Sequence, residues 1–402
     1  MTDRGILCAA GFFRSTAVAM TGVLLGFYLP AAGLTKGEMG AVVAAGLAGG
    51  AASVLLAAVA ADRIGRRRFL VALAALAVAG TAAAAFLDGP WALGAVAFAG
   101  MLNGMGRDRG AATAIEQALL PATTDDRGRT MAIARYTLLQ DAGRSLGNLA
   151  AALPSALVAM AGMDRLPSLR AGLLLCAALQ APAALLYLRL SPALVPPPAP
   201  RPPPVSPESR RVIARLCALF SLDAIGGGFL ASALLTIIFQ RQFGATDGAV
   251  ALLFTGASIL NALSHIGAAW LARRIGLINT MVFTHIPGSL LLLTVAWAPS
   301  FPVAAVLFLL REGLVEMDVP TRQSYVMAVV RPEERTAASG ATGLVRLGGW
   351  AVGSWIAGLV MGGAAAAVTL PLVISAGMKI TYDVLLWSSF RKLKPPEERE
   401  PA

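Results

Sequence analysis

Residues 309–322 read Leu309-Leu310-Arg311-Glu312-Gly313-Leu314-Val315-Glu316-Met317-Asp318-Val319-Pro320-Thr321-Arg322, inside an apolar stretch from about Phe301 to Val330. That stretch is long enough for a membrane-spanning helix, yet it carries two arginines, two glutamates and an aspartate. A charge near the bilayer centre costs at least about 2.5 to 3.5 kcal/mol on insertion scales. These side chains therefore cannot face lipid, and we expect them to face a protein interior or a water-filled path.

The charges of this stretch form two stripes on a helix, because successive residues turn by about 100°. Arg311, Asp318 and Arg322 share one stripe, and Glu312 and Glu316 share the next. Pro320 has no N–H and its ring clashes with the carbonyl of Glu316, which predicts a kink that leaves this carbonyl free. We expect a bent, polar, partly wet helix. The alternative is that the charges only pair with one another to hold helices together.

The composition of the whole chain is that of a membrane protein. Its 402 residues are 57% hydrophobic and only 14% charged, and the mean hydropathy is +0.70. A soluble protein would carry about 25% charged residues. The apolar stretches are about 20 residues or longer, which suits helices rather than the strands of a membrane barrel. The predicted class is an all-α integral membrane protein.

Turns and charges divide the chain into twelve expected transmembrane helices in two six-helix bundles, residues 1–190 and 212–402. The first six are roughly 6–29, 39–61, 69–87, 91–120, 131–157 and 166–190, and the last six are 212–239, 249–271, 278–297, 301–330, 337–361 and 366–390. Residues 191–211 join the bundles and are rich in proline, which favours an extended, semi-rigid spacer. Docking of a partner protein on this spacer is the alternative.

Arginine and lysine gather in every second loop, so the positive-inside rule puts both termini and the linker in the cytoplasm. We expect a multi-pass protein of the cell inner (plasma) membrane, monomeric in the lipid bilayer. The net charge of +11 does not indicate a nucleic-acid partner, because the basic residues form no stripe with interleaved aromatics.

An internal repeat supports two related halves. A shift of 206 positions carries the fourth and fifth spans onto the tenth and eleventh. The shift aligns Gln117 with Gln323, Arg129 with Arg335, Thr130 with Thr336, Ala132 with Ala338, Gly143 with Gly349 and Gly147 with Gly353. Several transporter folds are built from such parallel repeats.

The loop after the second span reads Ala58-Val59-Ala60-Ala61-Asp62-Arg63-Ile64-Gly65-Arg66-Arg67-Arg68. It resembles the major facilitator superfamily signature, a Gly-x-Leu-Ala-Asp-Arg-x-Gly-Arg-Lys/Arg segment between the second and third helices. Ala58 and Ala60 depart from that pattern, and the charged core matches it. Together with the twelve spans and the two halves, the resemblance covers essentially the whole chain. It implies a transporter that works by alternating access.

The resemblance also implies roles for particular residues. The signature forms a cytoplasmic charge latch in that superfamily, here Asp62, Arg63, Gly65 and Arg66. The matching loop 271–276 lacks the aspartate, so any latch is stronger in the first half. The first, fourth, seventh and tenth helices are expected to line a central cavity. Its candidate residues are Arg14, Asn103, Arg107, Arg109, Glu116, Arg311 and Asp318.

Energy for transport should come from an ion gradient, because the chain lacks a Gly-x-x-x-x-Gly-Lys-Ser/Thr phosphate cradle. Carboxylates beside arginines in a low-dielectric cavity are candidate proton carriers. We expect Glu312, Glu316, Asp223 and Asp108 to serve in this role. Asp141, Arg144 and Arg346 are expected to form a supporting ion-pair network. After Asp223, the run Gly226-Gly227-Gly228 predicts a bend in the seventh span.

Other chemistry finds little support in the sequence. His265 and His285 each lie alone on an apolar span, where a satisfied core histidine is the expected role, and they show no metal-site spacing. No Ser/His/Asp or Cys/His set indicates an enzyme, and we expect no cofactor. The leading hypothesis is a proton-coupled exporter of a small organic solute. The alternatives are a proton-coupled importer of a small organic anion and, less favoured, a non-transport membrane sensor.

Overall fold

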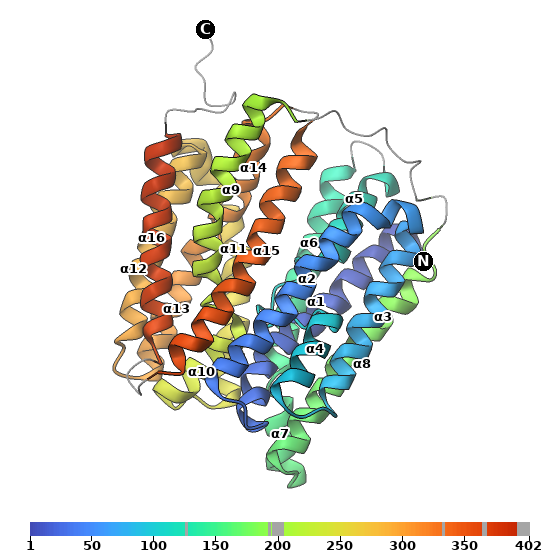
Figure 1. The fold of residues 1–402 in the computed structure, drawn as a ribbon, viewed down its shortest axis with the longest axis vertical. Helices are drawn as coiled ribbons and strands as arrows, with labels where there is room; N and C mark the ends of the chain where they lie inside the picture. The colour runs from blue at the N-terminus through green and yellow to red at the C-terminus, as the bar shows by residue number, and fades with distance from the viewer. Residues whose placement is uncertain (125–127, 192–193, 195–204, 332–333, 364–367, 392–402) are drawn as a thin grey trace. The chain divides into compact units, whose positions relative to one another are not determined.

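The structure is a computed structural model that describes residues 1–124, 128–191, 194, 205–331, 334–363 and 368–391. All regular secondary structure in these ranges is helical (Figure 1). The helices up to residue 190 are α1 (Asp3–Ala31), α2 (Lys36–Ile64), α3 (Arg66–Ala84), α4 (Pro90–Gly100), α5 (Ala111–Leu119), the 3-10 helix η1 (Leu120–Thr123), α6 (Arg129–Ala150), α7 (Leu153–Ala161) and α8 (Arg165–Tyr187). Those after it are α9 (Pro207–Gly228), α10 (Ser232–Phe243), α11 (Asp247–Ile275), α12 (Leu277–Ala296), α13 (Phe301–Val315), α14 (Asp318–Ala328), α15 (Arg335–Met361) and α16 (Leu370–Phe390).

Every predicted span corresponds to one helix or to a broken pair of helices. In the described ranges, eight helices are long and apolar enough to cross a membrane: α1, α2, α3, α8, α11, α12, α15 and α16. Each remaining predicted span is covered by two shorter helices, namely α4 with α5, α6 with α7, α9 with α10, and α13 with α14. The all-α membrane class is confirmed, and the arrangement is consistent with twelve spans.

Two of the breaks fall where the sequence predicts them. The glycine run ends α9 at Gly228, and α10 begins at Ser232. The tenth span breaks after Val315, one turn before Pro320. The prediction that the carbonyl of Glu316 is free is wrong. The backbone tightens into a turn there, and the N–H of Val319 donates to the Glu316 carbonyl at 3.3 Å.

The break in the fourth span was not predicted. Between Gly100 and Ala111 the backbone leaves the helix, with Met101 at φ +53° and Gly106 at φ +67°. Asn103 braces this segment, since its side-chain N–H donates to the Arg107 carbonyl at 2.7 Å and its side-chain oxygen accepts from the Met105 N–H at 2.9 Å. The predicted cavity residue Asn103 therefore acts on the shape of the chain.

The described helices fall into two compact units, each treated separately below. Unit 1 comprises residues 1–199, 231–255 and 354–368, and unit 2 comprises 200–230, 256–353 and 369–402. Within unit 1, the segment 231–255 is tied to helices of the first half. The Ala233 N–H donates to the Gly104 carbonyl at 3.0 Å, and Arg165 pairs with Asp247. The two six-helix bundles stay a prediction, and linker residues 195–204 lie outside the described ranges.

The sequence repeat is visible in how helices pack. In unit 1, a Cβ atom built on Gly147 of α6 would lie 2.0 Å from the carbonyl oxygen of Thr16 on α1. In unit 2, a Cβ atom built on Gly353 of α15 would lie 2.0 Å from the carbonyl oxygen of Ile225 on α9. These glycines are the pair that the 206-residue shift aligns. Each lets a helix backbone approach its neighbour closely.

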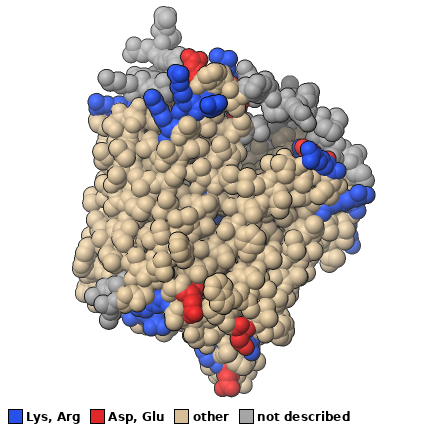
Figure 2. Space-filling model, viewed as in Figure 1, with Lys and Arg blue, Asp and Glu red and all other residues tan. Residues whose placement is uncertain are grey.

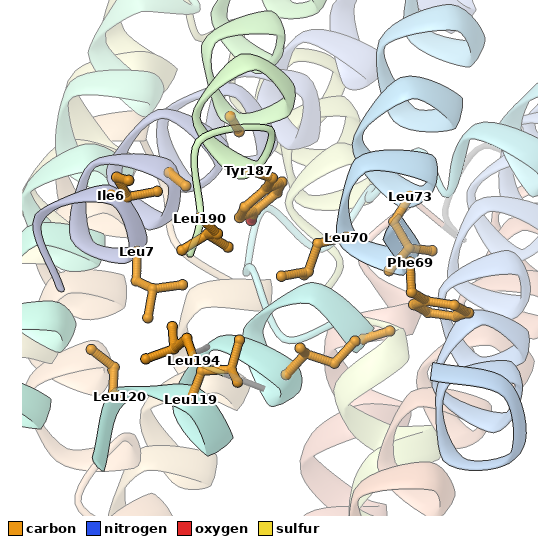
Figure 3. Close-up of a cluster of buried hydrophobic side chains, with 14 of the residues drawn as sticks. Ile6, Leu7, Phe69, Leu70, Leu73, Leu119, Leu120, Tyr187, Leu190 and Leu194 are labelled. Carbon is orange, nitrogen blue, oxygen red and sulfur yellow. The ribbon is translucent and has the colours of Figure 1, made fainter. Parts of the chain in front are cut away.

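The apolar side chains lie both inside each unit and on its surface. Figure 3 shows the buried cluster of unit 1, to which Leu7 of α1, Leu70 of α3 and Tyr187 of α8 contribute. Large hydrophobic side chains are also exposed, such as Leu138 (66%) and Ile266 (74%). On the face drawn in Figure 2, most charged side chains lie near helix ends and the middle is almost free of charge. This pattern suits helices surrounded by lipid.

Glu334 holds the start of α9, in the connection between α14 and α15. Its carboxylate accepts from the N–H of Ser206, the N-cap residue of α9, at 2.6 Å. Hydrogen bonds from the Ser209 side chain and the Ser206 N–H lower the pKa of Glu334 from its ordinary 4.5 to about 2. A carboxylate at a helix N-terminus also interacts favourably with the helix dipole.

The lowered pKa of Glu334 predicts a pH-dependent contribution to stability. Because the folded state favours the ionised form, the contribution is complete above pH 4.5 and is lost as the pH falls from 4.5 towards 2. Glu334→Gln should therefore lower the unfolding temperature at pH 7, and the difference from wild type should shrink at pH 3.5. Glu208→Gln is the control, because that side chain is 86% exposed. A pH-independent difference would contradict this assignment.

The close approach at Gly353 predicts a strong effect of one methyl group. Gly353→Ala should lower the unfolding temperature of the purified protein, since overpacking typically costs about 1 to 3 kcal/mol. Gly348→Ala on the same helix is the control, because a Cβ atom there meets nothing within 4 Å and alanine favours the helix. Equal thermal melts for the two variants would show that α9 and α15 do not pack this closely.

Candidate functional site

The buried charges of unit 1 gather around Arg14 of α1. Its Nε donates to Asp108 at 2.8 Å, and its Nη2 donates to Glu116 at 2.5 Å. Glu116 lies on α5, whereas Asp108 lies in the non-helical segment before that helix. The charge cluster of unit 1, defined here as Arg14, Asp108 and Glu116, therefore joins the first and fourth spans through one guanidinium group.

Two tyrosines complete the surroundings of Glu116, which is fully buried. Tyr136 of α6 donates to its Oε2 at 2.6 Å, and Tyr187 of α8 donates to its Oε1 at 2.6 Å. Both phenol rings are buried, and that of Tyr187 lies in the apolar cluster (Figure 3). A buried carboxylate needs such donors, because desolvation of an unpaired charge costs several kcal/mol.

Asp108 has a different set of partners. Besides Arg14, it accepts from Thr113 at 3.1 Å, from Ser15 at 3.4 Å and from Gln140 at 3.4 Å. Its side chain is 8% exposed. Hydroxyl and amide donors can reorient, so Asp108 is the carboxylate of this cluster whose partners can adapt to a change of protonation state.

The buried charges of unit 2 gather around Asp223 of α9. Its Oδ2 lies 2.8 Å from Nη1 of Arg322 on α14, and its Oδ1 accepts from Nζ of Lys379 on α16 at 2.8 Å. Arg322 also pairs with Asp318, one turn earlier on its own helix. The Arg322 guanidinium faces the rings of Phe220 and Tyr382 at 4.9 and 5.4 Å.

His285 of α12 links a second carboxylate, that of Asp383, to the charges around Asp223. The imidazole Nδ1 lies 3.0 and 2.9 Å from the two carboxylate oxygens of Asp383 on α16. Its Nε2 lies 3.4 Å from Nζ of Lys379. The charge cluster of unit 2, defined here as Asp223, Arg322, Lys379, His285 and Asp383, contains three residues that were not expected to be part of a charge cluster. Lys379 and Asp383 could have been found, because they are charges four positions apart in an apolar span.

The central ion pairs of the two units occupy corresponding positions with reversed charge. Glu116 and Arg322 are 206 positions apart, which is the repeat shift. Arg14 and Asp223 are 209 positions apart. The same separation holds for Thr16 and Ile225, whose carbonyl oxygens lie against Gly147 and Gly353. The pair between the first and fourth spans is thus arginine with glutamate. The pair between the seventh and tenth is aspartate with arginine.

The charged side chains of residues 309–322 make two separate sets of contacts. Asp318 and Arg322 belong to the surroundings of Asp223, whereas Glu312 accepts from Asn261 of α11 at 3.0 Å and from Arg311. All four charged side chains are buried, and so is Glu316. The charged side chains of the stretch thus face protein, as predicted. The roles of Glu312 and Glu316 in proton coupling stay a prediction.

The residues expected to form a supporting ion-pair network lie on α6 and α15. Arg144 pairs with Asp141 at 3.1 Å on α6 itself. Arg346 of α15 makes no ion pair within 4 Å in the described ranges, although its charge interacts with those of Asp223 and Arg322. Arg107 and Arg109 flank Asp108 in the non-helical segment and are half-buried.

The predicted latch residues lie where α2 meets α3. Arg66 pairs with Asp62 at 2.7 Å, and Gly65 between the helices has φ +96°. Asp62 is 58% exposed, so the pair is worth only about 0.3 to 0.5 kcal/mol to stability. Arg63 is exposed. Control of conformation by these residues stays a prediction.

No three His, Cys, Asp or Glu side chains of the described ranges lie close enough together to hold a metal ion. The charge clusters contain arginine, lysine and histidine beside their carboxylates, which suits ion pairing. The absence of a cofactor stays a prediction.

The shared guanidinium predicts non-additive effects in the charge cluster of unit 1. Arg14→Met leaves two buried carboxylates without their cation and should cost about 3 to 5 kcal/mol. In Arg14→Met/Glu116→Gln one of those charges is also removed, so the double variant should unfold at a higher temperature than Arg14→Met alone. Arg66→Met, which breaks an exposed pair, should change the melt little. Additive effects of the two buried substitutions would argue against the pair.

Comparisons with known proteins agree with this architecture. A sequence model of the Major Facilitator Superfamily matches residues 7–354 and 216–402. An uncharacterized membrane protein of Saccharomyces cerevisiae is 23% identical over 422 residues, covering 96% of this chain and 94% of the yeast protein.

Solved structures of similar fold include the nucleoside transporter NupG, with a TM-score of 0.74 and 16% identity over 97% of this chain and 100% of the other. The D-xylose-proton symporter has a TM-score of 0.75 and 14% identity over 98% of each chain. At these identities the likeness shows the fold alone. The family match extends from the first span to the last, and the chain belongs to the major facilitator superfamily of membrane transporters.

Proposed function

We propose that this transporter is driven by protons and exports a small organic solute by antiport, through alternating access. The observation that carries the proposal is the pair of charge clusters in membrane-spanning segments, one in each unit. In each unit an arginine is held by two carboxylates of low exposure, Arg14 by Asp108 and Glu116, and Arg322 by Asp223 and Asp318. Buried ionisable groups in spanning segments typically mark ion or substrate pathways.

Competition at one site supports exchange of proton and solute. Arg14 contacts both Asp108 and Glu116, so a proton on either carboxylate still leaves the guanidinium with an anionic partner. The cluster can therefore alternate between a protonated and an ionised form without exposing an unpaired arginine. A cationic or hydrogen-bonding group of a solute would compete with the proton for the same carboxylate. Such competition is the simplest physical basis of antiport.

The predicted proton carriers differ in their surroundings. Asp223 lies between Arg322 and Lys379, and each of its carboxylate oxygens pairs with one of these cations at 2.8 Å. We therefore assign Asp223 the role of a fixed anion. Asp108, Glu312 and Glu316 remain the proposed carboxylate carriers.

An importer of a small organic anion is the second candidate. The observation that favours it is Arg346, a low-exposure cation with no ion pair within 4 Å in the described ranges. Such a cation can receive a carboxylate or phosphate group from a ligand. In both proposals the protein works as a monomer in the inner (plasma) membrane. The arginine-rich loops support cytoplasmic termini.

The sign of the pH gradient separates the two proposals. Proteoliposomes containing the purified protein are loaded at one pH and diluted into another, in the presence of a panel of labelled organic cations, nucleosides, sugars and organic anions. Antiport predicts accumulation of a solute when the lumen is acidic, whereas symport predicts accumulation when the outside is acidic. A protonophore should abolish either. No gradient-dependent movement of any solute would overturn proton coupling for that panel.

The same assay tests the predicted carrier on the tenth span. Glu316→Gln should abolish gradient-driven accumulation while solute exchange without a gradient persists, because the amide cannot carry a proton. Glu208→Gln is the control, because that residue lies at the exposed start of α9. Unchanged accumulation in Glu316→Gln would remove this residue as a carrier.

A further inference from the structure

We propose that His285 is a further proton-binding group of unit 2, beside the proposed carboxylate carriers, and that it takes up a proton at Nε2 between Asp383 and Asp223. The use of that proton for transport rests on the proposed function, whereas proton binding by His285 does not. His285 is only 1% exposed, and yet both ring nitrogens have polar neighbours.

The hydrogen-bond partners assign the tautomer of the resting imidazole. The Lys379 ammonium has only donors, so the Nε2 atom 3.4 Å away accepts. Nδ1 then carries the hydrogen and donates to the Asp383 carboxylate, 2.9 Å away. A neutral imidazole protonated at Nδ1 thus donates to Asp383 and accepts from Lys379, and its unprotonated Nε2 can take up a proton.

Uptake of a proton at Nε2 changes this arrangement. The nitrogen becomes a donor and can no longer accept from Lys379, whose ammonium it would repel. Oδ1 of Asp223 lies 3.8 Å away and can accept from it after a small shift. Lys379 already donates to that same oxygen at 2.8 Å, so the imidazolium and the ammonium compete for it. The other oxygen of Asp223 stays with Arg322.

The groups that His285 itself meets are Asp223 on α9 and Lys379, Tyr382 and Asp383 on α16. Further charged groups lie near these partners or near α12: Arg311 on α13 beside Gly288, Asp318 and Arg322 on α14, and Arg346 on α15. The carboxylates of Asp383 and Asp223 therefore flank the ring, and the Lys379 ammonium lies beside it.

The proton would act on the ion pair that joins the seventh and tenth spans. An imidazolium that takes Oδ1 of Asp223 releases Lys379 and alters the field at Arg322. Both helices of that pair are broken close by, after Gly228 and after Val315. Protonation of His285 is thus placed to bias the shape of two bent spans.

The chain allows a direct test, because it has only two histidines. Protein with 15N-labelled histidine in lipid nanodiscs gives two imidazole spin systems, and His265→Asn leaves that of His285. At high pH the shifts should report the neutral Nδ1–H tautomer. Across about pH 9 to 5 they should change to the imidazolium.

Two charge variants test the neighbours. Asp383→Asn should move the titration midpoint of His285 to lower pH, and Lys379→Met should move it to higher pH, each by about 1 to 3 units. Lys36→Met on α2 in unit 1 is the control and should leave the midpoint unchanged. Thermal melts of all variants establish that they fold. If one variant does not fold, the other still tests the assignment.

Three results would overturn the proposal: an Nε2–H tautomer at high pH, no imidazolium by about pH 5, or a midpoint unaffected by Lys379→Met. The transport assay separates proton binding from its use. A titrating His285 without gradient-driven transport would leave the proton site intact and refute the proposed function. Wild-type gradient-driven transport in His285→Asn would remove His285 from coupling.

Discussion

A buried charge inside a membrane-spanning segment must be paired, because removing an ion from water costs several kcal/mol that lipid cannot offset. In unit 1 this requirement binds Arg14 to Asp108 and Glu116, and in unit 2 it binds Asp223 to Arg322. The pairs decide which faces of the helices point inward. They also fix the surrounding polar groups, since the tyrosine hydroxyls around Glu116 have a buried anion as acceptor.

The two halves satisfy this requirement with opposite polarity. Gly147 and Gly353 set the approach of neighbouring helices in the same way, and they do so because the backbone spacing admits no side chain. An ion pair requires only that its two charges differ in sign. Glutamate at one repeat position and arginine at the other can therefore both be accommodated, provided that the partner helix carries the complement. The two halves share the close packing of their helices, whereas the signs of their buried charges differ.

The sequence could predict which residues are buried, and it could not predict which residues meet. The cost of insertion acts on each charge separately, so the placement of Arg311 to Arg322 against protein follows from composition and spacing. Partners depend on packing between distant helices, such as His285 with Asp383, and a lone histidine on an apolar span gives no sign of them. The bend after Gly228 was predicted from a glycine run. The break at 101–110 was missed, although Gly100, Gly104, Gly106 and Gly110 lie there.

The breaks and the charges support each other. Backbone groups that leave a helix inside a membrane must find polar partners within the protein, and the buried charges provide a polar environment at those depths. In two of the four broken spans, the fourth and the tenth, the second helix begins near an aspartate. Asp108 precedes α5 and accepts from Thr113, and Asp318 is the first residue of α14. A helix N-terminus stabilises a negative charge, so each of these two breaks lowers the cost of holding an anion in mid-span. Each anion in turn holds an arginine, Arg14 or Arg322, so a break in one helix positions a charge that orders the next.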